Sequence, residues 1–171
     1  MLRHVKRVMD LNHYYATLLL DDIPDGQMCQ QPGSMVNHPA WSLGHITLSL
    51  EQGAMAIGMP SSLPEKWRTL FGLGSKPTPN RADYPGKAEL VRAYDAQHQR
   101  ISARLETLSA EELQEPNEGE GARGLLPTVG DALLFVATAH AGVHLGQISA
   151  WRRLMGLPHV LPMDRELDGA G

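Results

Sequence analysis

Apolar residues recur at intervals of three and four positions along four stretches of the chain, which is the spacing of an amphipathic α-helix. The first stretch covers residues 2–20, where charged side chains such as Arg3 and Asp10 fall outside the apolar stripe. This pattern predicts a helix over residues 2–20. Proline, glycine and polar residues in the following segment, residues 21–31, indicate a loop.

A second stripe begins after Pro39, which suits the first turn of a helix because the missing N–H of proline is not needed there. The stripe consists of Trp41, His45, Leu48, Gln52 and Met55. We therefore expect a second helix that ends near Gly58 and Pro60, where both residues disfavour its continuation.

A third helix is predicted over residues 87–108, which are rich in alanine and place their large apolar residues at helical spacing. Ser109 followed by Glu112 resembles a capping box, in which each residue bonds the backbone N–H of the other, so one further turn is expected.

The fourth helix should open at a second cap-like pair, Thr128 and Asp131, and run to about Met155. Gly156 and Pro158 then provide a stop signal. Its inner face is expected to carry Leu133, Val136, His140, His144, Gln147, Ile148, Trp151 and Leu154.

The connection from Pro60 to Gly86 is rich in proline and glycine, and only residues 65–71 are suited to a short helix. No stretch alternates like a β-strand, and no repeat of solenoid spacing is present. We therefore predict an all-α four-helix bundle with a long crossover connection between its second and third helices. A single domain should span residues 1–171, with residues 157–171 as an irregular tail.

Composition narrows the range of partners. A net charge of -4 argues against a nucleic acid held by a broad basic surface. Cys29 is the only cysteine, which excludes an internal disulfide framework and a thiolate zinc finger, and a reducing cytoplasm is the expected location. We identify no signal peptide and no apolar run of the roughly 20 residues needed to span a bilayer, so no membrane partner is expected.

The candidate chemistry starts with His140 and His144. Residues four apart lie on one face of a helix, so the two imidazoles could share a divalent metal ion, or each could merely donate a hydrogen bond. Ala141 and Gly142 occupy the positions where a zinc protease carries glutamate, so a peptidase of that type is not expected.

A functional ion would need another ligand. The candidates are His13, His38, His45, His98 and the carboxylates. His45 is the best placed, because it shares its stripe with Trp41 and Leu48 and should face inward. His38 precedes a proline at a helix start, which suggests a solvent-facing or capping residue.

Two segments carry a family resemblance. They read Asn37-His38-Pro39-Ala40-Trp41-Ser42-Leu43-Gly44-His45 and His140-x-x-x-His144-Leu145-Gly146-Gln147-Ile148, the latter followed by Arg152-Arg153 and Gly156-Leu157-Pro158. The chain resembles the DinB-like (damage-inducible, YfiT-like) superfamily of metal-binding four-helix bundles. The resemblance implies that His45, His140 and His144 are the metal ligands, and that the protein is a homodimer.

Three neutral imidazoles leave a divalent ion at least one open position for water or substrate. Such a set suits Zn²⁺ or Ni²⁺ best, with Fe²⁺, Co²⁺ and Mn²⁺ as alternatives. Gln147, one turn beyond His144, either orients a ligand or is a buried polar residue of the helix seam. Trp41 and Trp151 are expected to fill core or interface volume.

No general base is evident in the sequence. On the first helix, Asp10, Asn12, His13 and Tyr14 or Tyr15 could reach the mouth of the site, and the sequence does not distinguish among them.

The resemblance implies an enzyme that acts on a small molecule, either a transferase or isomerase that uses a low-molecular-weight thiol, or a hydrolase. The alternative is a non-catalytic protein of a stress response that binds a metal or ligand. A scaffold without metal would instead place His45 far from His140 and His144.

Overall fold

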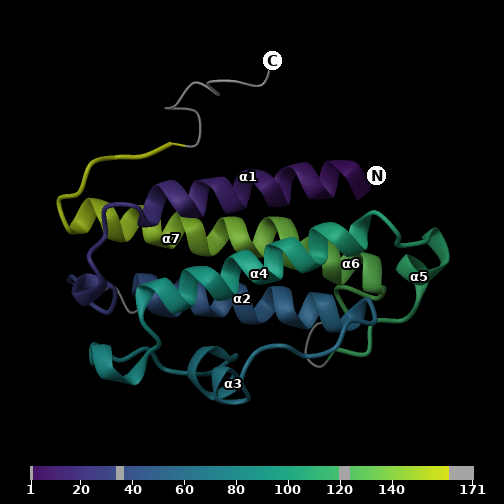
Figure 1. The fold of residues 1–171 in the computed structure, drawn as a ribbon, viewed down its shortest axis with the longest axis horizontal. Coiled ribbons are helices and arrows are strands. Elements are labelled where there is room, and N and C mark those ends of the chain that lie inside the picture. Colours follow the sequence, from purple (N-terminus) through teal and green to yellow (C-terminus); the bar gives the residue numbers. More distant parts are fainter. Residues whose placement is uncertain (1, 34–36, 120–123, 162–171) are drawn as a thin grey trace.

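Four long helical stretches lie side by side in the computed structural model, which describes residues 2–33, 37–119 and 124–161 (Figure 1). The first three stretches are α1 (Leu2–Leu20), α2 (Pro39–Ala56) and α4 (Lys87–Leu105). In the fourth, α6 (Val129–Leu134), the π-helix η3 (Phe135–His140) and α7 (Ala141–Leu154) follow one another without a break. Short helices fill the connections: η1 (Asp25–Gln27), α3 (Lys66–Phe71), η2 (Arg81–Asp83) and α5 (Ala110–Gln114).

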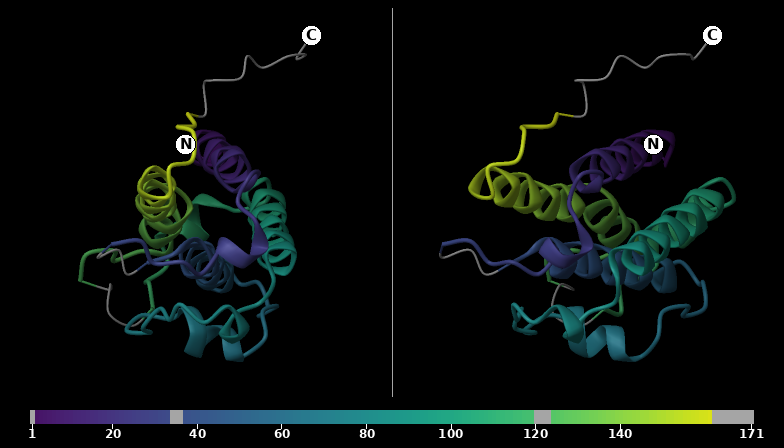
Figure 2. Two further views of the ribbon diagram at one scale, coloured as in Figure 1. Left: turned by 90° about the vertical axis from the view of Figure 1, so that its left-hand side faces the viewer. Right: turned by 60° about the vertical axis from the view of Figure 1, so that its left-hand side comes forward.

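The helices form a square in which α1 and α2 occupy opposite corners. Both α1 and α2 pack against α4 and against α7, as the view along the bundle shows (Figure 2). The neighbours α2 and α4 run in the same direction, so residues 57–86 must return the chain to the end of the bundle where α2 began (Figure 1). Along that path α3 packs on the outside of α2. Nearly every residue of α2 is therefore buried.

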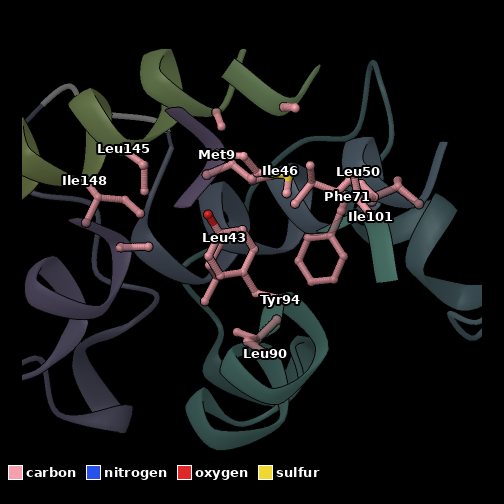
Figure 3. Close-up of a cluster of buried hydrophobic side chains, with 14 of the residues drawn as sticks. Met9, Leu43, Ile46, Leu50, Phe71, Leu90, Tyr94, Ile101, Leu145 and Ile148 are labelled. Atoms are coloured by element: carbon pink, nitrogen blue, oxygen red, sulfur yellow. The ribbon is translucent and has the colours of Figure 1, made fainter. Parts of the chain in front are cut away.

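The core lies between the four stretches and continues under α3. Figure 3 shows part of it, with Met9 of α1, Phe71 of α3 and apolar side chains of α2, α4 and α7. The buried side chains labelled from those last three helices are Leu43, Ile46, Leu50, Leu90, Tyr94, Ile101, Leu145 and Ile148. Because burial of each large apolar side chain contributes about 1.5–3 kcal/mol, packing of this core stabilises the fold.

A buried carboxylate fastens the start of the connection to the bundle. Glu51 of α2 accepts hydrogen bonds from the backbone N–H groups of Ser62 and Leu63, at 2.6 and 3.0 Å, and from the hydroxyl groups of Ser61 and Ser62. From α4, Arg100 forms an ion pair with the same carboxylate at 2.9 Å, and Gln97 donates to it at 2.8 Å. This network holds residues 61–63 against α2 and α4.

The all-α class is confirmed. The first helix has the predicted bounds, and both predicted capping boxes are present, at Ser109 with Glu112 and at Thr128 with Asp131. The second and third helices are two or three residues shorter than expected. The main difference is the π-helix η3, which interrupts the single α-helix predicted from residue 128 to residue 155.

The prediction of one domain over residues 1–171 stays a prediction. Of the expected tail, residues 157–161 are described and are not helical, whereas residues 162–171 lie outside the described residues.

The stretch Val129–Leu154 is long and apolar enough to cross a membrane by length and composition alone, which was not predicted from the sequence. Core helices meet the same criterion, and this one packs against α1 and α2.

Candidate metal centre

Three imidazoles meet between α2 and the last helical stretch. His45 comes from α2, His140 is the last residue of η3, and His144 lies one turn further along in α7. One ring nitrogen of each lies within 4.8 Å of the others, and the Nε2 atoms of His45 and His140 are 3.2 Å apart. Two nitrogens bound at about 2.0–2.1 Å to one tetrahedral ion would be roughly 3.3 Å apart, so the spacing fits a shared ion.

A backbone carbonyl sets the orientation of His45. Its Nδ1 atom lies 2.6 Å from the carbonyl oxygen of Phe71, the last residue of α3. Because a carbonyl only accepts, Nδ1 carries the proton and Nε2 presents its lone pair to the site. The indole of Trp41 stacks on one face of the His45 imidazole, with ring centroids 4.7 Å apart and an angle of 10° between the planes.

The glycine before His45 makes this contact possible. A Cβ atom at Gly44 would lie 2.3 Å from the ring of Phe71, which is far inside van der Waals contact. The absence of a side chain at position 44 therefore lets α3 approach α2 closely enough for the Phe71 carbonyl to reach His45.

His144 is oriented by side chains. Its Nδ1 atom lies 2.9 Å from Oε1 of Gln147, which also accepts a hydrogen bond of 3.0 Å from the amide of Asn37. The donation from Asn37 keeps Oε1 turned toward the imidazole, so Nδ1 of His144 is the donor and Nε2 is left for a ligand. Gln147 thus orients His144, one of the two roles considered from the sequence.

His140 differs from the other two. Its Nδ1 atom is buried and has no hydrogen-bond partner among the described residues. A buried polar atom without a partner costs about 1–3 kcal/mol and is explained by strain, by the chemistry of a site or by an ordered water. A ligand bound at Nε2 would leave Nδ1 without a partner, so the metal site rests on the position of Nε2, 3.2 Å from His45 Nε2, and not on Nδ1.

The backbone before His140 is unusual as well. η3 is a π-helix, whose defining hydrogen bonds run five residues back instead of four; such turns occur mostly as single turns within α-helices and are frequent at functional sites. The amide of Asn12 on α1 donates to the carbonyl oxygens of Ala137 and Thr138, at 3.4 and 3.0 Å. On α2, Gly53 leaves room for the side chain of Val136 in η3. A Cβ atom at position 53 would lie 2.7 Å from a methyl carbon of Val136.

The environment keeps all three imidazoles neutral. Burial lowers the pKa of His45, His140 and His144, and for His140 the two neighbouring imidazoles lower it further, to about 4. Metal binding requires the neutral imidazole, and the lowered pKa values favour that form near pH 7.

The histidines line a cavity of about 740 Å³. The other lining residues are Asn37, Trp41 and residues 73–77 of the connection. None of the described residues that line it carries a carboxylate, so the structure offers no general base beside the imidazoles. An ion held by the three histidines would face this cavity with at least one position open to a small molecule.

The remaining histidine candidates lie elsewhere. His38 is fully buried and caps α2: Nδ1 accepts from the backbone N–H of Trp41, and Nε2 lies 2.9 Å from the carbonyl oxygen of Thr78. It is a capping residue and not a solvent-facing one. His13 and His98 stack on each other between α1 and α4, where they bond Asp95 and Asp10 at 2.7 and 2.8 Å.

The residues of α1 considered for the mouth of the site do not line the cavity. Asp10 and His13 bond to α4, Asn12 bonds to η3, and the Tyr15 hydroxyl donates to the carbonyl oxygen of Val160. Trp151 is buried, as expected, whereas Trp41 is buried but also lines the cavity.

Sequence reasoning missed three contributors to the site, namely the Phe71 carbonyl, the π-helix and residues 73–77. A fourth, Asn37, stands at the start of the first motif but was given no role. Its position in the motif was the one available signal.

In the comparison with protein families, the family model of the DinB superfamily matches residues 10–148. The matched region includes all three histidines and Gln147. Comparison with curated proteins gives no match.

Proposed function

The chain belongs to the DinB superfamily, and on that premise we propose that it is a metal-dependent enzyme that activates a small thiol. His45, His140 and His144 would hold a divalent ion, Zn²⁺ or Ni²⁺ being the best suited and Fe²⁺, Co²⁺ or Mn²⁺ the alternatives. When bound, the ion would act as a Lewis acid that lowers the pKa of a bound thiol.

The observation that carries the proposal is the convergence of three imidazoles, whose ligand nitrogens all lie within 4.8 Å of one another. Phe71 and Gln147 hold the Nδ1 protons of His45 and His144, so two of the three lone pairs are already aimed.

The lining of the cavity favours thiol activation over hydrolysis. Zinc peptidases of the H-E-x-x-H type use a glutamate beside the ion as a general base, and no described lining residue of this cavity carries a carboxylate. A thiol needs only the loss of its own proton, and that proton could leave to solvent through the open cavity. A hydrolase remains the second candidate reaction, and a non-catalytic metal-binding protein of a stress response remains the alternative class.

The test is elemental analysis of protein purified without a metal-affinity column, alongside a variant with His45, His140 and His144 all changed to alanine. The variant His98→Ala is the matched control, because it also removes an imidazole but lies between α1 and α4. We expect near-stoichiometric metal in the unmodified protein and in His98→Ala, and none in the triple variant, which should remain helical.

The metal-loaded protein would then be assayed with thiols and an electrophile, and separately with ester and amide substrates. Turnover that needs both the thiol and the three histidines supports the proposal. Failure of the unmodified protein to take up added Zn²⁺ or Ni²⁺ would refute it, whereas metal uptake without any turnover favours the non-catalytic alternative.

We also propose a cytoplasmic location, a homodimer, and no nucleic-acid or membrane partner. The single cysteine supports the location, and the acidic net charge supports the absence of a nucleic-acid partner. Exposed apolar side chains on the last helical stretch, at Leu134, Phe135 and Val143, are compatible with a second copy of the chain. Sedimentation of the purified protein measures the oligomeric state directly.

A further inference from the structure

The cavity beside the histidines has one wall that does not come from the bundle. Residues 73–77 form it, and they follow α3 in the connection to α4. Whatever binds at the histidines also meets this segment, so its side chains bear on which molecules fit.

Lys76 is the only charged side chain among the described residues that line the cavity. Its ammonium group forms no hydrogen bond or ion pair with any described residue. The rest of the lining is mostly apolar or neutral, including Trp41 and Leu73, and Leu73 is 98 % exposed. The cavity thus combines an apolar surface with a single unpaired positive charge.

The backbone on both sides of Lys76 is held in place. Before it, the hydroxyl of Ser75 accepts a hydrogen bond of 2.9 Å from the indole N–H of Trp41. After it, the carbonyl of Thr78 lies 2.9 Å from Nε2 of His38, and its N–H donates to the hydroxyl of Tyr84 at 2.9 Å. The Nδ1 atom of His38 accepts from a backbone N–H, so its Nε2 must be the donor. These bonds fix the place of Lys76 beside the cavity while its side chain stays free to adjust.

We propose that the substrate is a two-ended molecule, with a thiol that reaches the histidines and a carboxylate or phosphate that pairs with Lys76. An apolar stem between the ends would pack on Trp41 and Leu73. This inference rests on the proposed function for the thiol end, whereas the anionic end rests on Lys76 alone.

A matched pair of thiols tests the anionic end. Mercaptohexanoate and mercaptohexanol share a thiol and an apolar stem, and only the first carries a charge at the far end. Each is titrated into protein loaded with Co²⁺, and the sulfur-to-cobalt charge-transfer band reports binding. The proteins compared are the unmodified chain, Lys76→Met, and the control Lys66→Met, which removes an exposed lysine of α3 that does not line the cavity.

We expect Lys76→Met to weaken mercaptohexanoate binding about 3- to 5-fold, the range for an exposed ion pair, and to leave mercaptohexanol binding unchanged. Raising the salt concentration to about 1 M should remove the difference, because charges then act over only about 3 Å. Equal effects on both thiols, or the same loss in Lys66→Met, would overturn the proposal.

A second comparison separates this proposal from the proposed function. If neither thiol gives a charge-transfer band, thiol activation fails, and hexanoate and hexanol, which lack the thiol, are then compared by calorimetry. A preference for hexanoate that disappears in Lys76→Met upholds the anionic subsite without the thiol chemistry. No such preference overturns the anionic subsite as well.

Discussion

The side-chain amide of Asn12 donates to the carbonyl oxygen of Thr138 at 3.0 Å, joining α1 to the π-helix that ends at His140. Carbonyl groups in a π-helix are displaced from the regular α-helical pattern, so an outside donor stabilises the turn. The turn that carries His140 is therefore joined to a residue of α1 that does not itself line the cavity.

Replacing Asn12 should lower both the stability of the fold and the metal affinity of the site. We expect Asn12→Ala to lower the free energy of unfolding by about 1–2 kcal/mol, because two carbonyl oxygens lose their donor. Metal affinity, measured by competition with a coloured chelator, should fall in the same variant. The control is Thr17→Ala, an exposed position of α1 whose hydroxyl bonds only within that helix. Unchanged metal affinity in Asn12→Ala would show that the π-helix persists without this bond.

The close approach of Phe71 to Gly44 leads to a second prediction. In Gly44→Ala the new methyl group would collide with the Phe71 ring, and we expect a loss of about 1–3 kcal/mol of stability from overpacking. The displaced α3 would also withdraw the carbonyl that orients His45, so metal affinity should fall. Urea unfolding and chelator competition measure the two effects.

The matched control for that substitution is Gly142→Ala. Position 142 lies between the two other histidines, but a Cβ atom there meets open space. A helical glycine replaced by alanine should gain roughly 0.5–1 kcal/mol of stability. If Gly44→Ala proved as stable as Gly142→Ala, the proposed reason for the glycine beside His45 would be wrong.

Gln147 provides a prediction for the second imidazole. Groups that orient metal-bound histidines typically contribute 10–100-fold to affinity, so we expect a loss of about that size in Gln147→Ala. Gln147→Glu keeps an oxygen that can accept from His144 Nδ1 and should retain most of the affinity. Similar losses in both variants would mean that the acceptor oxygen is not what orients His144.

The fourth prediction concerns pH. Burial alone would raise the pKa of Glu51, but the N–H groups of Leu63 and Ser62 and the hydroxyl groups of Ser61 and Ser62 outweigh it and lower the pKa to about 2. The ordinary pKa is 4.5. A folded-state pKa below the unfolded one stabilises the fold above pH 4.5, and this contribution is lost as the pH falls from about 4.5 to 2.

We expect Glu51→Gln to be less stable than the unmodified protein by roughly 2–3 kcal/mol at pH 7, and the gap to shrink progressively below pH 4.5. Urea unfolding at a series of pH values measures the gap. The control is Glu106→Gln, at an exposed position just after α4, which should show little difference at any pH. A gap for Glu51→Gln that stays constant down to pH 3 would contradict the prediction.

The sequence predicted those features that depend on local periodicity. The bounds of α1 followed from its apolar stripe, and both capping boxes followed from polar pairs three residues apart. The inward position of His45 could be predicted from its place in the stripe of α2, and the pairing of His140 with His144 from helical spacing.

Other features had no local signature. Before His140, the residues of η3 are apolar or small, like those of an ordinary helix, and the donor to its carbonyl groups, Asn12, is more than a hundred residues away. The carbonyl that orients His45 is a backbone group, so the identity of Phe71 could not reveal it. The approach of Lys76 to the cavity depends on how the connection folds back across α2.

The three histidines belong to helices of the bundle, whereas one wall of the cavity that they face consists of residues 73–77 of the connection. Substitutions in residues 73–77 can therefore alter this wall without altering the histidines. A chimaera that keeps Phe71 and receives a different segment in place of residues 73–77 should bind added metal as the unmodified chain does and acquire another ligand preference. Divergence among chains of this architecture can then proceed through one surface segment, without loss of the three-histidine centre.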